Sequence, residues 1–181
     1  MLTLHFRRAR DTDVAAVVDL VESAYRGERS LAGWTSEATL LGGQRTDAAE
    51  VGEAIASAGS VVLLAEADEG LLACCRVARH DRAVAEFGMF AVRPDRQGQG
   101  LGRRLLAAAE QHARDELGAT TMRMHVIRQR SELIAWYERL GYRRTGEAAP
   151  FPYDDERFGV PKQDDLELVV LERDLAGRPD A

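Results

Sequence analysis

The stretch EFGMFAVRPDRQGQGLGRRLL, residues 86–106, decides how this chain folds. An apolar run typical of a β-strand leads into a glycine-rich turn, and the turn opens an amphipathic segment that predicts a helix. Gly98, Gly100 and Gly102 alternate where that helix begins. A helix start offers unpaired backbone N–H groups and the positive end of the helix dipole, and glycine leaves room for an anion to reach them.

The residues around this turn favour phosphate as the anion. Arg103 and Arg104 follow the glycines, and Arg93 and Arg96 precede them. Each glycine inside a helix costs up to about 1 kcal/mol relative to alanine. Arginines at a helix start oppose the dipole by about 0.3–1 kcal/mol each, and a bound anion reverses that effect. The alternative is a plain turn with solvated arginines, but its place between a strong strand and a strong helix favours an anion site.

Two common nucleotide motifs do not fit the turn. A P-loop requires Lys-Ser or Lys-Thr after its last glycine, and neither pair follows these glycines. The dinucleotide pattern G-x-G-x-x-G fails because its third glycine falls on Arg103 or Leu105. A nucleotide-binding domain is therefore a weak alternative.

The rest of the chain alternates strands and helices within one domain, expected over residues 1–175 with a loose tail at 176–181. Short connections between 61 and 92 predict antiparallel pairing, whereas the strand–helix–strand unit of residues 83–127 requires a crossover and therefore parallel strands. The result is an α/β fold with a mixed sheet and helices on both faces. The expected strands are 2–9, 61–67, 71–79, 83–92, 120–127, 142–147 and 165–174, and the expected helices start at Asp11 or Thr12, after Thr35 or Ser36, and at Asp47, and span 100–117 and 131–140.

Composition excludes several classes of function. With 45% hydrophobic and 30% charged residues the chain has the balance of a globular protein, and its net charge of -6 argues against non-specific nucleic-acid binding. Cys74 and Cys75 are adjacent, which suits neither a disulfide framework nor a metal site. The start MLTLHFRRARDTD lacks a signal-type apolar stretch, and no run of about 18 apolar residues occurs. We therefore expect a cytoplasmic protein with no membrane partner.

Two motifs resemble those of one enzyme family. Gln97-x-x-Gly100-x-Gly102 is similar to the [Arg/Gln]-x-x-Gly-x-[Gly/Ala] signature of the GCN5-related N-acetyltransferases (GNAT), and IAWYERLGYRRTGE, residues 134–147, resembles the family's second signature helix and the glycine that ends it. The resemblance covers most of the chain and is weak over residues 26–58. It implies the acyl-CoA N-acyltransferase fold, with a mostly antiparallel sheet of about seven strands, and acetyl-CoA as cofactor.

The resemblance also implies how the cofactor is held. Backbone groups of residues 90–92 would pair with the pantetheine arm as an added strand. Pairing of this kind requires the strand of residues 83–92 to part from the strand of residues 120–127. A β-bulge at Gly88 is expected to help the two strands part. Arg130 stands where many members carry an asparagine that helps hold the cofactor. The implied cofactor-binding residues are Phe90, Ala91, Val92, Gln97, Gly98, Gln99, Gly100, Leu101, Gly102, Arg103, Arg104 and Arg130.

Tyr137 is the implied general acid, because the leaving thiolate needs a proton that a nearby phenol can supply. Because its neighbours on the helix are apolar, the alternative is that Tyr137 is only a core residue. The general base stays open. Glu86 on the central strand comes first, Glu37 second and His125 third. The alternative for Glu86 is an exposed carboxylate at the strand end, and the alternative for His125 is a neutral core or surface histidine.

The acceptor is expected to be a small-molecule or peptide amine, bound by Tyr25, Trp34 and Glu37. Further acceptor groups are expected in the loop 148–162, and acidic ones would attract a cationic amine. The alternative function is a non-catalytic acyl-CoA-binding sensor or scaffold. A homodimer is common in the family, but no feature of the sequence establishes one. The notable side chains of the loop are Phe151, Tyr153, Asp154, Asp155 and Glu156.

Overall fold

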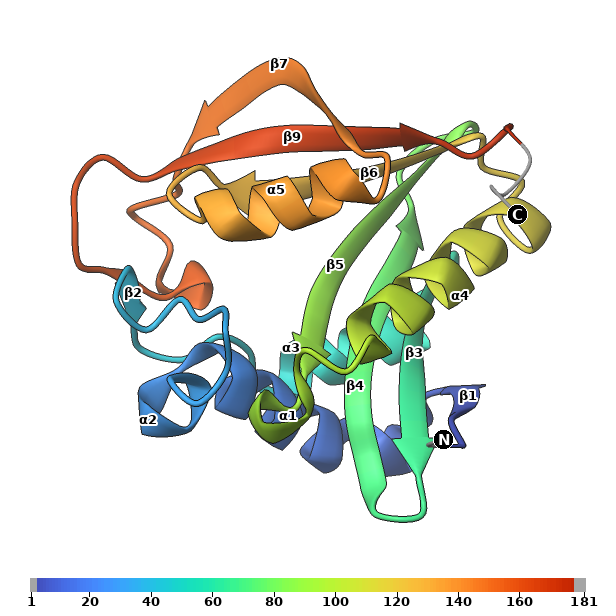
Figure 1. Ribbon diagram of the computed structural model, residues 1–181, viewed down its shortest axis with the longest axis horizontal. Coiled ribbons are helices and arrows are strands. Elements are labelled where there is room, and N and C mark those ends of the chain that lie inside the picture. Colours follow the sequence, from blue (N-terminus) through green and yellow to red (C-terminus); the bar gives the residue numbers. More distant parts are fainter. Residues whose placement is uncertain (1–2, 178–181) are drawn as a thin grey trace.

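The computed structural model describes residues 3–177, and its centre is a seven-stranded mixed sheet flanked by helices on both faces (Figure 1). This confirms the expected architecture. The strands, in their order across the sheet, are β1 (His5–Arg8), β3 (Ser60–Ala67), β4 (Gly70–Arg79), β5 (Val84–Val92), β6 (Thr121–Ile127), β9 (Glu167–Asp174) and β7 (Arg143–Pro150). The helices are α1 (Val14–Tyr25), α2 (Gly27–Ser30), α3 (Ala48–Ala56), α4 (Leu101–Asp115) and α5 (Ser131–Arg139), with short 3₁₀ turns at Asp11–Asp13, Pro94–Arg96 and Glu156–Phe158.

The two central strands part from each other, as Figure 1 shows for β5 and β6. They run parallel and pair at Val84–Glu86 against Thr121–Arg123, after which β6 continues alone against β9. Beyond Glu86, the edge of β5 that faced β6 has no strand partner among residues 3–177. A strand edge of this kind carries backbone donors and acceptors for another extended chain.

The bulge in β5 lies one residue later than the sequence suggested. Gly88 still pairs with Arg76, and the register then shifts so that Ala91 pairs with Cys74. Met89 and Phe90 therefore face a single residue of β4, and Met89 has a φ of 47°. The expectation of a bulge at Gly88 was wrong, because pairing with β4 is retained at the glycine and broken only after it.

The segment before β3 departs furthest from the predicted elements. The helix expected after Thr35 or Ser36 is absent, because the Ser36 hydroxyl accepts the Ala38 N–H and the Leu40 and Leu41 N–H groups both bond to the Glu37 carbonyl, closing a tight turn. A four-residue helix, α2, forms earlier. β2 (Leu41–Gly42) pairs with β8 (Val160–Pro161), a contact the sequence did not indicate. The predictions for residue 2 and for residues 178–181 lie outside the described residues.

Two hydrophobic cores cover the two faces of the sheet. Leu105, Ile134 and Tyr137 belong to the core under α4 and α5, whereas Val17 and Val51 belong to the core under α1 and α3. Cys74 and Cys75 fall in opposite cores, as alternation along a strand predicts. Burial raises the pKa of the Cys74 thiol to about 12. Both cysteines therefore serve packing rather than reactivity.

A buried polar cluster ties α4 to the second half of the sheet. The Tyr142 hydroxyl donates to Glu110 Oε1 at 2.8 Å, and Arg173 Nη1 reaches Glu110 Oε2 at 3.0 Å. We expect Tyr142→Phe to lower the free energy of unfolding by about 1.5–3 kcal/mol, because the buried carboxylate loses one charge-assisted hydrogen bond. Urea unfolding measures the change, and an unaltered midpoint would contradict it.

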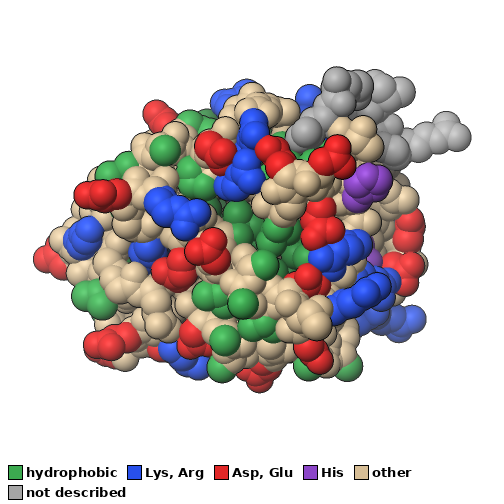
Figure 2. Space-filling view, turned by 90° about the horizontal axis from the view of Figure 1, so that it is seen from below, with side chains coloured by type: hydrophobic (Ala, Val, Ile, Leu, Met, Phe, Trp, Pro, Cys, Tyr) green, Lys and Arg blue, Asp and Glu red, His purple; other side chains and the backbone are tan. Residues whose placement is uncertain are grey.

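The surface shows no continuous field of one charge on the face drawn in Figure 2, where acidic and basic side chains are interspersed around a central patch of hydrophobic ones. This mixed distribution agrees with a sequence that has 24 Lys and Arg against 30 Asp and Glu. Within residues 3–177, no helix combines the length and apolar character needed to cross a membrane.

Candidate active site

The glycine turn that opens α4 adopts the conformation that only glycine accepts readily. Gly98 and Gly100 have φ angles of 76° and 78°, and Gly100 is the N-cap of the helix. A Cβ built at either position meets no atom within 4 Å. Side chains here would be strained and would fill the space in front of the first N–H groups of α4. The turn is therefore shaped as a cradle for an anion.

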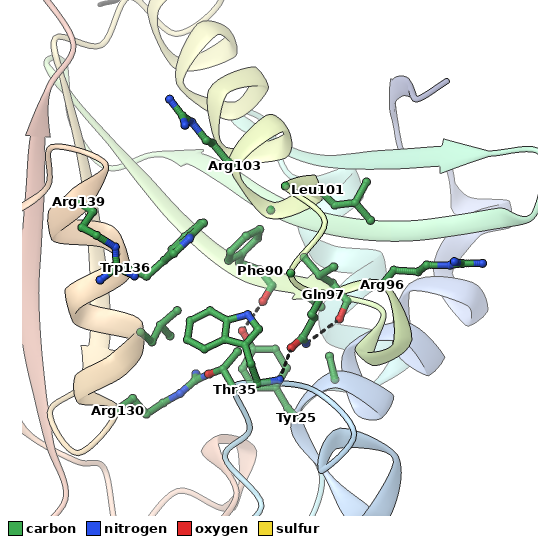
Figure 3. A pocket seen from close by; sticks show the side chains of 18 residues that line it. Tyr25, Thr35, Phe90, Arg96, Gln97, Leu101, Arg103, Arg130, Trp136 and Arg139 are labelled. Carbon is green, nitrogen blue, oxygen red and sulfur yellow. Dashed lines mark hydrogen bonds between the residues drawn. The ribbon is translucent and has the colours of Figure 1, made fainter. Parts of the chain in front are cut away.

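A cavity of about 450 Å³ runs from this turn along the unpaired part of β5 to the end of α1 (Figure 3). It brings together most of the residues predicted to hold a cofactor: Phe90, Ala91, Val92, Gln97, Gly98, Gly100, Leu101, Gly102, Arg103 and Arg130. Gln99 and Arg104 do not line it, and the Arg104 guanidinium lies 5.9 Å from the ring centre of Phe6 instead. Arg96 lines the cavity but pairs with Glu69.

Three lining residues come from α5 and were missed from the sequence. Leu133, Trp136 and Arg139 follow one another at three-residue spacing, which places them on one side of the helix. Of the three, Leu133 was interpreted only as an apolar neighbour of Tyr137. Trp136 stacks on Phe90 with ring centres 6.0 Å apart and planes at 18°. A Cβ on Gly102 would come within 3.1 Å of Phe90 Cζ, so this glycine lets α4 approach the aromatic pair closely.

Tyr137 lies beside the cavity, packed against aromatic rings. Its ring centre is 5.0 Å from that of Trp136 and 5.7 Å from that of Tyr142, and 4% of the residue is exposed. Its hydroxyl has no hydrogen-bond partner among residues 3–177. Burial raises the pKa of this phenol well above its ordinary value. The group therefore keeps its proton at neutral pH and has it free to donate.

Side chains also occupy the edge of β5 at the cavity. The Tyr25 hydroxyl donates to the Phe90 carbonyl, and Gln97 Nε2 donates to the Val92 carbonyl at 3.1 Å. Gln97 Oε1 in turn accepts the Trp34 N–H at 3.0 Å. A carbonyl oxygen accepts two hydrogen bonds, so each can still bind a second donor. Gln97 thus links the loop of Trp34 to the central strand.

Arg130 and Glu37 form a buried ion pair at the far end of the cavity. Arg130 Nη1 lies 2.8 Å from Glu37 Oε1, and its Nη2 donates to the Thr35 hydroxyl at 2.6 Å. Glu37 Oε2 is 2.9 Å from Arg26 Nη1. Burial alone would raise the pKa of Glu37, but the guanidinium groups of Arg130, Arg45 and Arg26 outweigh it and the pKa lies below its ordinary value. A carboxylate held in this way is a poor proton acceptor.

Comparison with known proteins identifies the fold around this cavity. Residues 58–144 match the model of the acetyltransferase (GNAT) domain. The chain carries a GNAT acetyltransferase domain. The match confirms the resemblance inferred from residues 86–147, and no curated protein matches the chain in sequence.

Solved structures share the GNAT fold over nearly the whole chain. One is yncA from Salmonella typhimurium, solved with its cofactor acetyl-CoA, at 24% identity and a TM-score of 0.69 over 99% of both chains. A GNAT-family protein from Desulfovibrio desulfuricans is 20% identical, with a TM-score of 0.67 over 96% of this chain and 99% of its own. A chimera of the spermidine N-acetyltransferase SpeG from Vibrio cholerae is 16% identical, with a TM-score of 0.67 over 96% of both chains.

A second group of titratable side chains lies on the central strands of the GNAT domain. Glu86 Oε1 is 3.5 Å from His125 Nδ1, and its Oε2 is 3.7 Å from His80 Nδ1. The hydrogen bond with His125 is the main cause that holds the pKa of Glu86 below its ordinary value. Glu86 is half-buried where β5 and β6 begin to part, and it does not line the cavity. The structure thus places Glu86 and His125, two of the three candidates for the general base, next to each other.

The loop expected to bind the acceptor is anchored away from the cavity. Phe151 is buried in a small core with Leu41 and Leu166, and the Tyr153 hydroxyl accepts the Leu166 N–H at 2.7 Å. Asp155 pairs with Arg157. Asp154 and Glu156 are exposed and, like the rest of this group, do not line the cavity. Of the three residues predicted to bind substrate, Tyr25 and Trp34 line it, whereas Glu37 is enclosed behind Arg130.

Proposed function

We propose that this GNAT domain is an N-acetyltransferase that uses acetyl-CoA and acetylates a primary amine of a small molecule or peptide. The observation that carries the proposal is the unpaired edge of β5 beyond Glu86, which ends in the glycine turn of α4 with one cavity along both. A spermidine N-acetyltransferase among the structures of the same fold supports nitrogen as the acceptor atom.

The residues present fit acetyl-CoA. When bound, this cofactor supplies an acetyl thioester whose carbonyl carbon an amine attacks, releasing a thiolate. The open space in front of Gly98 and Gly100 suits a pyrophosphate on the first N–H groups of α4. Arg103 and Arg139 line the same cavity and add positive charge. The backbone of residues 90–92 offers strand-like pairing to an extended amide chain.

Tyr137 is the proposed general acid. A proton on its hydroxyl is available because the group has no competing partner among residues 3–177, and burial keeps it protonated. The phenol lies beside the bulge, with its ring centre 6.5 Å from that of Phe90. Donation from Tyr137 to the departing sulfur would leave a neutral thiol.

Glu86, with His125, is the proposed route for the proton that the amine loses. Replacing Glu86 with glutamine should lower kcat/KM by about 10²-fold at neutral pH, within the usual range for a general base. The pKa of Glu86 lies below its ordinary value, so the carboxylate is ionised at neutral pH and its contribution is lost only as the pH falls through that lowered pKa. The pH profile of kcat/KM measures this. Asp81→Asn, at an exposed turn nearby, is the control, and a profile equal to that of the parent would remove Glu86 from the mechanism.

A thermal-shift titration with acetyl-CoA, CoA, ADP and NAD tests the cofactor assignment. A ligand that binds only the folded state stabilises it by about 2.7 kcal/mol at a hundredfold excess over its dissociation constant. We expect acetyl-CoA and CoA to raise the melting temperature and ADP and NAD to do little. Release of free CoA thiol in the presence of an amine panel then separates an enzyme from a non-catalytic acyl-CoA sensor.

A further inference from the structure

The bulge in β5 contains a strained residue. Within residues 3–177, Met89 is the only residue other than glycine that has a positive φ, at 47°. A left-handed backbone is unfavourable for a residue with a long side chain, and it persists only where the surrounding contacts hold it. The Met89 side chain is buried in the core under α1 and α3. A second contact is expected to hold the backbone that follows it.

That contact comes from Tyr25, the last residue of α1 (Figure 3). The Tyr25 hydroxyl donates to the carbonyl of Phe90, the residue directly after Met89, and so joins positions that are 65 residues apart. On this side of β5, β6 pairs only with Val84–Glu86, and among residues 3–177 no other strand takes its place at the bulge. A side chain from α1 therefore bonds to the strand edge that β6 has left.

The Tyr25 side chain is itself held in position. The guanidinium groups of Arg45 and Arg130 lie 5.3 and 5.4 Å from the centre of its ring. Arg130 is fixed in turn by Glu37, at 2.8 Å, and by the Thr35 hydroxyl, at 2.6 Å. Burial raises the pKa of the Tyr25 phenol, although both guanidinium groups act in the opposite direction. The phenol therefore stays protonated at neutral pH and remains a donor to the carbonyl.

The backbone that Tyr25 holds lies beside the proposed general acid. The ring centre of Phe90 is 6.5 Å from that of Tyr137 and 6.0 Å from that of Trp136. Phe90 is also the first of the three residues proposed to pair with the cofactor. A change in the bulge would therefore move the cofactor edge of β5 relative to Tyr137. Misplacing reacting groups by about 1 Å can lower a rate by about 10²-fold.

We propose that Tyr25 is a positioning residue, whose hydroxyl holds the strained Met89–Phe90 backbone in the shape that presents the edge of β5 to the cofactor beside Tyr137. The inference rests on the proposed function and deepens it. It gives Tyr25 a role different from the acceptor binding that the sequence suggested, because its hydroxyl is already bonded to β5. The role requires no contact between Tyr25 and the amine.

Tyr25→Phe tests the proposal through the separate values of kcat and KM. Turnover is followed by release of CoA thiol with a panel of primary amines. We expect kcat to fall by about 10–100-fold for every amine that the parent acetylates, because the geometry of the reacting groups is disturbed. The KM for the amine and the calorimetric affinity for CoA should each stay within about twofold of the parent. A raised amine KM at unchanged kcat would show that Tyr25 binds the acceptor, and would overturn the proposal.

Tyr153→Phe is the matched control. The Tyr153 hydroxyl is also bonded to a backbone group, since it accepts the Leu166 N–H at 2.7 Å, but Tyr153 does not line the cavity. The same single oxygen is removed in both variants. Tyr153→Phe should leave kcat unchanged, and an equal loss of kcat in both variants would refute a specific role for Tyr25.

Met89→Gly provides a rescue experiment. Glycine adopts a positive φ without strain, so a bulge with glycine at this position needs less support from Tyr25. In the Met89→Gly background, Tyr25→Phe should lower kcat by less than about threefold. An undiminished loss would mean that the hydroxyl acts in another way. Because the substitution also removes a buried side chain, its fold is checked by thermal unfolding, and the kcat and KM values of Tyr25→Phe decide the question if it does not fold.

Amide hydrogen exchange tests the same hydrogen bond without cofactor or turnover. In the free protein, we expect Tyr25→Phe to speed exchange of the backbone amides of residues 88–92 by at least about tenfold, because the bulge opens more readily. Tyr153→Phe should leave these amides unchanged. Equal exchange in Tyr25→Phe and the parent, measured by NMR, would show that the hydroxyl does not hold the bulge.

Failure of this inference is distinguishable from failure of the proposed function. If the parent acetylates amines and Tyr25→Phe does so at the same kcat, the enzyme stands and the positioning role does not. If the parent acetylates no amine, the proposed function fails and the catalytic role of Tyr25 fails with it, whereas faster exchange in Tyr25→Phe would still show that its hydroxyl holds the bulge.

Discussion

Tyr137→Phe should lower kcat by about 10²–10⁴-fold, the usual contribution of a general acid, while acetyl-CoA affinity changes little. The expectation follows from the packing of the ring. The hydroxyl has no hydrogen-bond partner among residues 3–177, so its removal breaks no contact there. The phenyl ring keeps its neighbours Phe90, Trp136 and Tyr142. A loss of rate with an intact fold and intact cofactor binding would therefore report on the proton alone.

Tyr142→Phe is the matched control for this experiment. Its ring centre lies 5.7 Å from that of Tyr137, and the same single oxygen is removed. The Tyr142 hydroxyl donates to buried Glu110, so this variant should lose stability and keep its kcat. The two substitutions thus have opposite expected profiles, measured by urea unfolding and by steady-state release of CoA thiol. Normal turnover in Tyr137→Phe would show that the proton comes from another donor.

Gly100→Ala should weaken binding of CoA and acetyl-CoA by about 10–100-fold, the effect of losing one charge-assisted hydrogen bond at the phosphates. Gly100 is the N-cap of α4 with a φ of 78°, and a Cβ there meets no protein atom within 4 Å. The methyl group would occupy the space through which an anion reaches the N–H groups of the helix. The left-handed backbone adds a stability cost of about 1–2 kcal/mol.

Gly118→Ala separates these two effects. Gly118 lies just beyond the other end of α4 with a φ of 65°, and a Cβ there also meets nothing within 4 Å. It should cost similar stability and leave cofactor affinity unchanged, because it does not line the cavity. Calorimetric titration with CoA measures the affinities. Equal CoA binding by Gly100→Ala and the parent would remove the phosphate cradle from the start of α4.

Short-range patterns were enough to predict the central part of this protein. The strand, glycine turn and helix of residues 84–115 depend on alternation, backbone freedom and amphipathic spacing, all of which are local, and the structure agrees with each. The crossover from β5 to β6 followed from chain geometry, since parallel strands need a long connection. The motif at Gln97 to Gly102 pointed to the GNAT family for the same reason, because it encodes one backbone turn.

Contacts between distant segments could not be read from the chain. Glu37 and Arg130 are 93 residues apart, and only the folded sheet brings the loop after α2 against the start of α5. That contact joins a candidate base, Glu37, and a candidate cofactor ligand, Arg130, in one buried ion pair. The bulge at Met89 also depends on the partner strand, because register is a property of two strands and not of one.

The sequence by itself determined the fold class, the family and the position of the proposed phosphate cradle, because each depends on residues that are close together along the chain. Tertiary structure alone decided which charged groups pair at the end of α1, because ion pairing depends on distances that form only when α1, the Glu37 turn and the start of α5 meet.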